Sequence, residues 1–370
     1  MAIIHELNLF SWKDFQEDLQ NLGDLERLRL VIDTIPDAKL MGILKTLRGN
    51  GRNDHPIEAV WNSILAGIVY EHVSIESLRR ELSRNAQLRE ICGFNPISGV
   101  KGVPSKSAYN RFLSNLVHQE VLVREMFDNL VTELSILVPG FGTNYAGDGK
   151  AIESLGNPPK KKDGDHRREE DADWGVKKYQ GIDGNGKPWE KIKSWFGFRL
   201  HVIVDADAEL PIAYKVTKAS EGEGPVMDEL FVELEEKHPE LIKQCEHAMF
   251  DKGYDSKERI CTLWEKYEIK AIIDIRNMWK DGEKTRLLKN KKILNATYDF
   301  KGTVFCHCPQ TGEIRPMAYN GFEKKRETLK YTCPALAYGI ECKGASNCCD
   351  VSFGFERHYI RWLKKMNLRC

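Results

Sequence analysis

Apolar residues recur at intervals of three and four along the first 140 residues, which is the spacing of amphipathic helices. One such run predicts a helix and comprises Ile57, Val60, Trp61, Ile64, Leu65 and Ile68. A second run, Ile75, Leu78 and Leu82, predicts another helix, and Ser74 stands where its hydroxyl can cap the first turn. This part of the chain therefore reads as helical.

After a short break with glycine and proline, Ser105 or Ser107 can cap a third helix, and a fourth helix follows. We expect residues 1–140 to form a separate all-α domain. Short helices with small turns between them suit a DNA-binding module, and they suit an ordinary helical bundle equally well. In a DNA-binding module, Arg79 and Arg80 would contact DNA from between the apolar positions of the second helix.

Beyond residue 140 the pattern changes to the alternation of apolar and polar residues that is typical of strands. A dense run of charged residues over 157–178 predicts an exposed loop. Helices are expected over 226–238 and 256–267, and strands over 143–148, 198–205, 210–217, 245–251 and 269–276. The order is three strands, then helix, strand, helix and strand, which predicts an α/β fold with a mixed sheet over residues 141–300.

The composition sets limits on the protein class. Apolar residues make up 41% of the 370, and Lys plus Arg and Asp plus Glu are 55 each, so a folded core is expected and the net charge is zero. No apolar run reaches the roughly 18 residues of a membrane helix, and the N-terminus lacks the basic start of a signal peptide. We expect a cytoplasmic protein with no membrane partner.

The neutral total hides a basic segment. Residues 276–301 hold eight Lys or Arg against three acids, a net charge of +5. Such a segment can bind phosphate even in a neutral protein, and Lys289, Lys291 and Lys292 are its candidate DNA contacts. A solvated loop or helix face explains the same charges equally well.

Six of the ten cysteines fall within 44 residues, at Cys306, Cys308, Cys333, Cys342, Cys348 and Cys349. Without a secretory signal, a metal site explains this cluster better than disulfides do. Thiolates from the first four, with Cys348 or Cys349, could hold a structural Zn²⁺. Free thiols are the alternative, because only one short Cys pair is present. Residues 301–350 are therefore expected to form a small Cys-rich zinc-binding region.

Two aspartates occupy similar settings. Asp148 and Asp251 each follow a predicted strand and stand beside or near a glycine. Carboxylates from neighbouring strands are hard oxygen ligands that suit Mg²⁺ or Mn²⁺, and two such ions about 3.5–4 Å apart can promote phosphodiester chemistry. The alternative is that both are ordinary turn aspartates. Lys150 follows Asp148 and could contact phosphate.

Four other positions are expected to be structural. Asp205 closes a predicted strand and reads as a turn residue more than as a metal ligand, and His201 reads as a packed histidine. Trp174 and Trp195 are expected to anchor the core or a loop rather than to stack on a base.

Several motifs resemble the DDE transposases of bacterial insertion sequences, which have an RNase-H-like core. The motifs are Gly147-Asp-Gly-Lys-Ala-Ile152, Asp173-Trp-Gly175, Lys193-Ser-Trp-Phe-Gly-Phe198, Val216-Thr-Lys-Ala-Ser220 and Phe250-Asp-Lys-Gly-Tyr254. The segment from His55 to Phe112 resembles the helical N-terminal domain of these proteins, and the cysteine cluster resembles a zinc-ribbon-like insertion found in some of them. The resemblance runs from about residue 40 to the end.

The resemblance implies metal-dependent DNA strand cleavage and transfer by a homodimer, acting on terminal inverted repeats and a target duplex in the bacterial nucleoid. Asp148 and Asp251 match the first two acids of the triad. The family's third acid, a glutamate on a basic helix, has no match here, which predicts an internal deletion near Cys349 and Asp350 and a missing C-terminal helix. Residues 351–370 would then be a remnant.

Three functions stay open on this reading. The first is a transposase impaired by the loss of the third acid. The second is a non-catalytic, sequence-specific DNA-binding remnant of a transposase, and the third is an RNase-H-like nuclease with unrelated substrates.

Overall fold

A computed structural model describes most of the chain, and its parts fall into two compact units, residues 1–137 and 138–370. The described residues are 23–49, 54–156, 158, 169–182, 187–279, 281–287, 296–308, 310–323, 328–339, 341–343 and 360–361. None of the helices in these ranges combines the length and the apolar character needed to cross a membrane.

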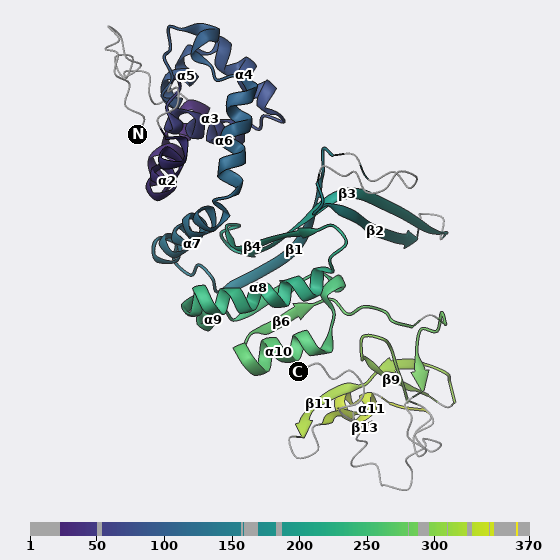
Figure 1. The fold of residues 1–370 in the computed structure, drawn as a ribbon. Coiled ribbons are helices and arrows are strands. Elements are labelled where there is room, and N and C mark those ends of the chain that lie inside the picture. The colour runs from purple at the N-terminus through teal and green to yellow at the C-terminus, as the bar shows by residue number, and fades with distance from the viewer. Residues whose placement is uncertain are drawn as a thin grey trace. The chain divides into compact units, whose positions relative to one another are not determined.

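The first unit is helical, as the apolar spacing predicts (Figure 1). Its helices are α1 (Asp24–Thr34), α2 (Ala38–Arg48), α3 (Ile57–Val69), α4 (Ile75–Arg84), α5 (Ala86–Cys92), α6 (Lys106–Val117) and α7 (Glu120–Leu137). Helix α3 buries residues on most of its surface, so it forms the centre of this core. Four of the helices were expected, whereas α1, α2 and α5 were not.

Side-chain caps explain where the expected helices begin. The Ser74 hydroxyl accepts a hydrogen bond from the Ser77 amide at the start of α4, and Ser105 accepts one from the Ala108 amide at the start of α6. Of the two serines proposed to cap α6, Ser105 is therefore the cap. These bonds satisfy amides that the first turn of a helix leaves without partners.

The second unit contains a six-stranded mixed sheet with the order β2-β3-β1-β5-β6, and β4 pairs with β3. Its strands are β1 (Asn144–Glu153), β2 (Asp173–Ile182), β3 (Pro188–Asp205), β4 (Pro211–Lys218), β5 (His247–Phe250) and β6 (Lys270–Ile273). Helices α8 (Glu223–Lys237), α9 (Pro239–Gln244) and α10 (Lys257–Tyr267) follow β4 and β5 (Figure 1). The mixed α/β fold with a helical N-terminal region is confirmed.

Strand β3 is longer than expected, because it begins at Pro188 instead of Phe198. Its first half pairs with β2, and its second half pairs with β1 and β4. Strands β2 and β3 thereby form a two-stranded arm that runs beyond the rest of the sheet (Figure 1). The expectation of a loop over 157–178 is wrong from residue 173 onward, where β2 begins.

The chain after β6 contains two small antiparallel sheets. One comprises β7 (Arg286–Leu287), β8 (Ala296–Tyr298), β9 (Val304–His307) and β10 (Ile314–Pro316), and the other β11 (Ala318–Glu323), β12 (Thr328–Thr332) and β13 (Ile360–Arg361). A short helix, α11 (Pro334–Tyr338), follows β12.

Candidate active site

The two predicted aspartates lie on neighbouring strands. Asp148 is within β1, Asp251 directly follows β5, and these strands are parallel neighbours. Gly147 pairs with Phe250, so each aspartate comes one residue after the same register pair. Neighbouring strands lie about 4.8 Å apart, and both aspartates are exposed. The fold therefore brings both carboxylates to one place.

The Asp251 carboxylate is held by the turn that follows it. Its Oδ1 accepts a hydrogen bond of 2.7 Å from the Gly253 amide, at the start of a 3₁₀ turn over Lys252–Tyr254. A Cβ at position 253 would lie 2.7 Å from that oxygen, so a glycine is needed for this close approach. One carboxylate oxygen is thus fixed by the backbone, which orients the other.

A third carboxylate, Glu223, is the first residue of α8 and lies against the strand that carries Asp148. A Cβ on Gly149 of β1 would lie 3.1 Å from both Cγ and Oε1 of Glu223, so this side chain packs directly on the strand that carries Asp148. Sequence reasoning overlooked Glu223. The available signal was an acid at a helix start between two glycines, Gly222 and Gly224.

The charges around Glu223 show which groups surround it. Burial is the largest cause that raises its pKa above the usual range, and the negative charges of Asp148 and Asp251 raise the pKa further. The positive charges of Arg199 and Lys177 lower it. Glu223 therefore senses both aspartates, which makes the three acids one electrostatic group.

Arg199 is the nearest counter-ion of this group. Its Nη1 lies 3.4 Å from Glu223 Oε1 and donates a hydrogen bond of 3.0 Å to the Glu221 carbonyl. The guanidinium lies over the ring of Trp195, 5.2 Å from its centroid. Arg199 and Trp195 are both buried, so a fixed cation stands beside Glu223. Trp195 is an anchor, as expected.

Tyr254 adds a buried hydroxyl beside the acids. Its side chain is fully buried, and its hydroxyl has no hydrogen-bond partner among the described residues. Burial is the main cause that raises the pKa of this phenol, and the charges of Glu223, Asp148 and Asp251 raise it further. A buried polar atom without a partner costs free energy, so this hydroxyl is a donor available to the site.

The acids fit a divalent cation by their chemistry. All three present carboxylate oxygens, the hard donors that Mg²⁺ and Mn²⁺ prefer. Within the described ranges, however, no three His, Cys, Asp or Glu side chains already lie in a geometry that could hold a metal ion. Glu223 contacts the Arg199 guanidinium.

The other predicted residues near the sheet have different surroundings. Lys150 is exposed on β1. Asp205 is buried and accepts hydrogen bonds from the amides of Gly142, Asp207 and Ala208, so it is a turn residue as expected. His201 is fully buried and its Nε2 lies 2.9 Å from the Thr217 hydroxyl. His201 is therefore packed in the sheet.

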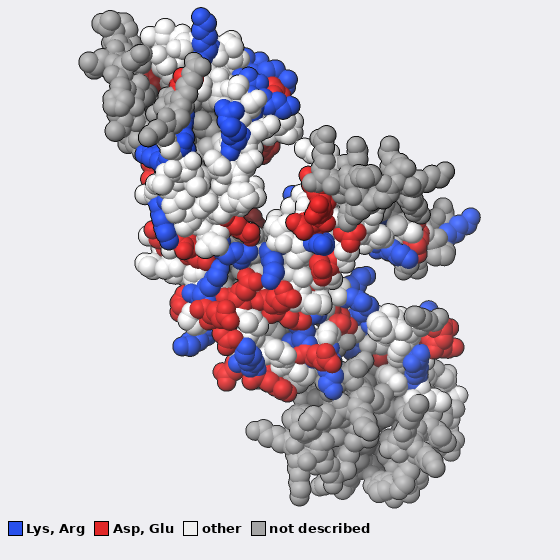
Figure 2. All heavy atoms as spheres, viewed as in Figure 1, with Lys and Arg blue, Asp and Glu red and all other residues white. Residues whose placement is uncertain are grey.

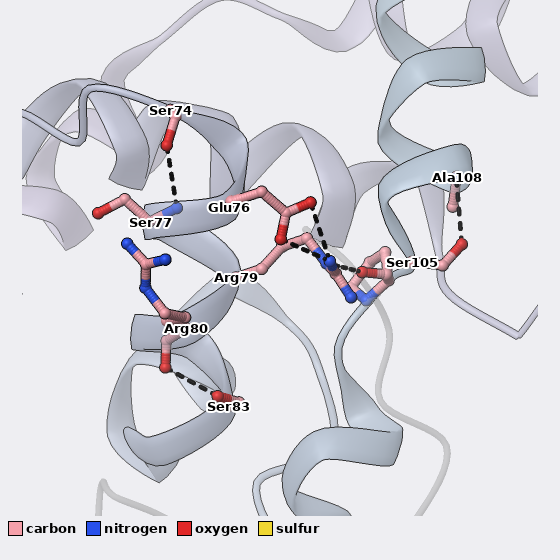
Figure 3. A network of polar contacts seen from close by, with 9 residues as sticks. Ser74, Glu76, Ser77, Arg79, Arg80, Ser83, Ser105 and Ala108 are labelled. Carbon is pink, nitrogen blue, oxygen red and sulfur yellow. Dashed lines mark hydrogen bonds and ion pairs between the residues drawn. The ribbon is translucent and has the colours of Figure 1, made fainter.

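The predicted DNA contacts of the helical unit differ from each other (Figure 3). Arg79 is held inside the unit, because it donates to the Pro104 carbonyl at 2.9 Å and pairs with Glu76 at 2.9 Å. Arg80 is exposed, and its guanidinium has no hydrogen-bond partner among the residues described. Of the two, Arg80 is the side chain that is open to a phosphate.

The Cys-rich and basic regions are described only in part. Cys306, Cys308, Cys333 and Cys342 are half-buried thiols, and the charges of Cys308 and Cys342 both act on Arg315. Cys348, Cys349, Lys289, Lys291 and Lys292 lie outside the described residues. The zinc site stays a prediction, since the described thiols form no metal-binding group of three or more.

Comparison with known proteins gives a family match over part of the chain. Residues 161–331 match the model of a family described as "Transposase DDE domain", a range that contains Glu223 and Asp251 and begins after Asp148. No curated protein matches the sequence.

A solved structure, the "Cryo-EM structure of piggyBac transposase synaptic complex with hairpin DNA", is similar at 14% identity with a TM-score of 0.32. The match covers 80% of this chain and 60% of that chain, and it is too weak to assign a fold. The family match does not depend on it. Residues 161–331, a little under half of the chain, are similar to the transposase DDE domain family.

Proposed function

We propose that this protein cleaves and joins DNA strands as a transposase and that Asp148, Asp251 and Glu223 hold its Mg²⁺ or Mn²⁺. The observation that carries this proposal is the parallel pairing of β1 with β5, which brings Asp148 and Asp251 to neighbouring strand positions, together with the packing of Glu223 on β1. When bound, the ions would activate the attacking oxygen and stabilise the leaving oxygen of a phosphodiester.

The chain's own residues prepare the site in three ways. The Gly253 amide keeps the Asp251 carboxylate oriented. Arg199 neutralises part of the acidic charge, so that three carboxylates can lie close together in the protein. The Tyr254 hydroxyl supplies a proton donor that has no other described partner.

The missing C-terminal glutamate was expected to impair catalysis, and Glu223 changes that expectation. The C-terminal tail holds another glutamate, Glu356, which lies outside the described residues, whereas Glu223 packs on the strand that carries Asp148. On this proposal the chain keeps a third acid and retains activity. A DNA-binding remnant without catalysis is the alternative, and the following experiment separates the two.

The test compares Asp148→Asn, Asp251→Asn and Glu223→Gln with the matched control Glu221→Gln. Glu221 is exposed, lies two residues from Glu223 and loses the same charge. Mn²⁺ binding is measured by electron paramagnetic resonance, and cleavage is measured on a plasmid that carries the gene with its flanking genomic DNA.

We expect each of the three site variants to weaken Mn²⁺ binding at least about tenfold and to abolish cleavage, with the control unchanged. DNA binding without metal-dependent cleavage by the wild type would support the remnant instead. Full cleavage by Glu223→Gln would remove Glu223 from the site.

Two further parts of the proposal concern assembly. We infer that thiols of the Cys-rich region hold a structural Zn²⁺ and that the protein acts as a homodimer on double-stranded DNA. Metal analysis of the purified protein should find about one zinc per chain, and sedimentation should find two chains per DNA complex. A zinc content well below one per chain would argue against the zinc site.

A further inference from the structure

The arm formed by β2 and β3 has two faces of different character. Register pairs place Lys177 opposite Lys193 and Tyr179 opposite Lys191, and Gly181 opposite Trp189. Because side chains alternate along a strand, these residues share one face of the arm. We call this set of five side chains, Lys177, Tyr179, Trp189, Lys191 and Lys193, the basic face.

The opposite face carries different residues. Trp174 and Phe196 are a register pair there, and their rings are in edge contact with centroids 5.8 Å apart. Val176 and Ile192 follow on the same side, both more than half exposed. The lysines are thus concentrated on one side of the arm, with Lys178 on the other.

The basic face is continuous with the acidic centre. Gly175 and Trp195 are the next register pair toward the core, and a Cβ on Gly175 would meet the Trp195 ring at 2.4 Å, so both are on this face. Arg199 lies over the same ring and contacts Glu223. The charge of Lys177 also reaches Glu223. One uninterrupted strand, β3, therefore connects the basic face to the proposed catalytic acids.

The lysines of this face are available for a partner. Lys191 and Lys193 are exposed and Lys177 is half-buried. No described acidic residue forms an ion pair within 4.0 Å with Lys177, Lys191 or Lys193. Tyr179 and Trp189 are 41% and 46% exposed, so both rings are accessible to a nucleic acid.

We propose that the basic face binds the phosphate backbone of double-stranded DNA and leads the strand to be cut toward Asp148, Glu223 and Asp251. This rests on the proposed function. From Lys191 to Arg199 the strand rises about 26 Å, which matches about eight base pairs of duplex. Lysines and exposed aromatics together are the chemistry that binds nucleic acid.

Acidic residues elsewhere on the second unit favour an approach of DNA along the arm. Figure 2 shows acidic side chains gathered over α8 and α9, and Asp228, Glu229, Glu236 and Glu240 are exposed there. That surface would repel a duplex, so DNA that reaches the acids is directed along the arm.

The test compares two variants with equal charge change. The basic-face variant combines Lys177→Gln, Lys191→Gln and Lys193→Gln. The control variant combines Lys178→Gln, Lys243→Gln and Lys257→Gln, whose lysines are exposed but lie outside the basic face. Binding to a 30-base-pair duplex of arbitrary sequence is measured over a range of salt concentrations. Circular dichroism checks that each variant is folded.

We expect the basic-face variant to bind about 10- to 100-fold more weakly at 0.1 M salt, with a salt dependence reduced by about 2.7 in its logarithmic slope. The control should change less than about threefold. Equal losses in both variants, or a loss in neither, would overturn the proposal.

The two proposals fail in different ways. Wild-type protein that binds DNA through these lysines but cuts nothing would overturn the catalytic function and leave the basic face in place. A basic-face variant that binds and cuts DNA as well as the wild type would do the reverse. Failure of the wild type to bind any duplex would overturn both.

Discussion

Gly197 is the residue where β3 changes partners, and replacing it with alanine should disrupt the base of the arm. Gly197 pairs with Glu153 of β1 and with Asp173 of β2, so three strands meet there. Its φ is +151°, a backbone conformation that residues with a side chain rarely adopt. A Cβ would lie 2.3 Å from the Ile152 carbonyl oxygen and 2.6 Å from the Ser154 nitrogen.

The magnitude follows from two costs. The strained backbone costs about 1–3 kcal/mol. The new methyl group also displaces the segment that makes the 2.9 Å hydrogen bond from the Ser154 amide to the Phe196 carbonyl, which costs about 1–3 kcal/mol more. Gly197→Ala should therefore lower the free energy of unfolding by about 2–6 kcal/mol.

Urea unfolding followed by tryptophan fluorescence measures this change, because Trp195 is buried two residues away. Gly222→Ala is the matched control in the same unit. Its Cβ would lie 3.4 Å from Pro225, an ordinary contact, and φ is −73°, so it should cost at most about 1 kcal/mol. A loss below 1 kcal/mol for Gly197→Ala would show that the strand junction does not require glycine.

Three further outcomes are expected. Burial is the main cause that holds the pKa of His201 down at about 4, so the neutral form is favoured in the folded state and stability is lost as the pH falls below about 6.5. Between pH 7 and 5 the free energy of unfolding should drop by about 2 kcal/mol, and His201→Gln should remove that slope in urea titrations. Tyr254→Phe removes a buried hydroxyl without a described partner and should raise the melting temperature by the equivalent of about 1 kcal/mol; a lower melting temperature would mean that the hydroxyl is bonded. Arg89→Met should cost about 3 kcal/mol or more, because the buried Arg89 donates to the carbonyls of Leu82, Ser83 and Pro96, and the exposed Arg84→Met should cost little in the same thermal assay.

Side-chain caps explain only part of which helices were expected, because α3 was expected without a cap bond and α5, capped by Asn85, was not expected. Ser74 and Ser105 cap α4 and α6, and both helices begin where the sequence indicates. Helices α1 and α2 have no side-chain cap bond. Their apolar spacing therefore lacked the start signal that would have defined them.

Strand β2 was missed for a different physical reason. A strand is predicted from sequence mainly by the alternation of apolar and polar residues, which arises because one face is buried and the other is solvated. In the arm, Trp174, Val176, Lys178 and Tyr179 are all exposed, so burial imposes no alternation on the sequence. The polar run before β2 then hid the strand inside an apparent loop.

The candidate site was partly predictable because strand ends are local features. Asp148 and Asp251 each stand next to a recognisable strand, and parallel pairing of those strands brings them together. Glu223 depends on how the start of α8 packs on Gly149, a contact between residues 74 positions apart. No local sequence pattern predicts this contact, so Glu223 was identified only from the fold.

The charges of the site also connect catalysis with DNA binding. Asp148, Glu223 and Asp251 carry three negative charges, and Arg199 and Lys177 supply two positive ones. In the described structure, these two cations interact electrostatically with Glu223. Once a divalent cation shares that role, Lys177 at the inner end of the basic face is free to attract phosphate, whereas the buried Arg199 stays beside Glu223. Metal and DNA should therefore strengthen each other's binding, since each relieves a charge that the other would have to neutralise.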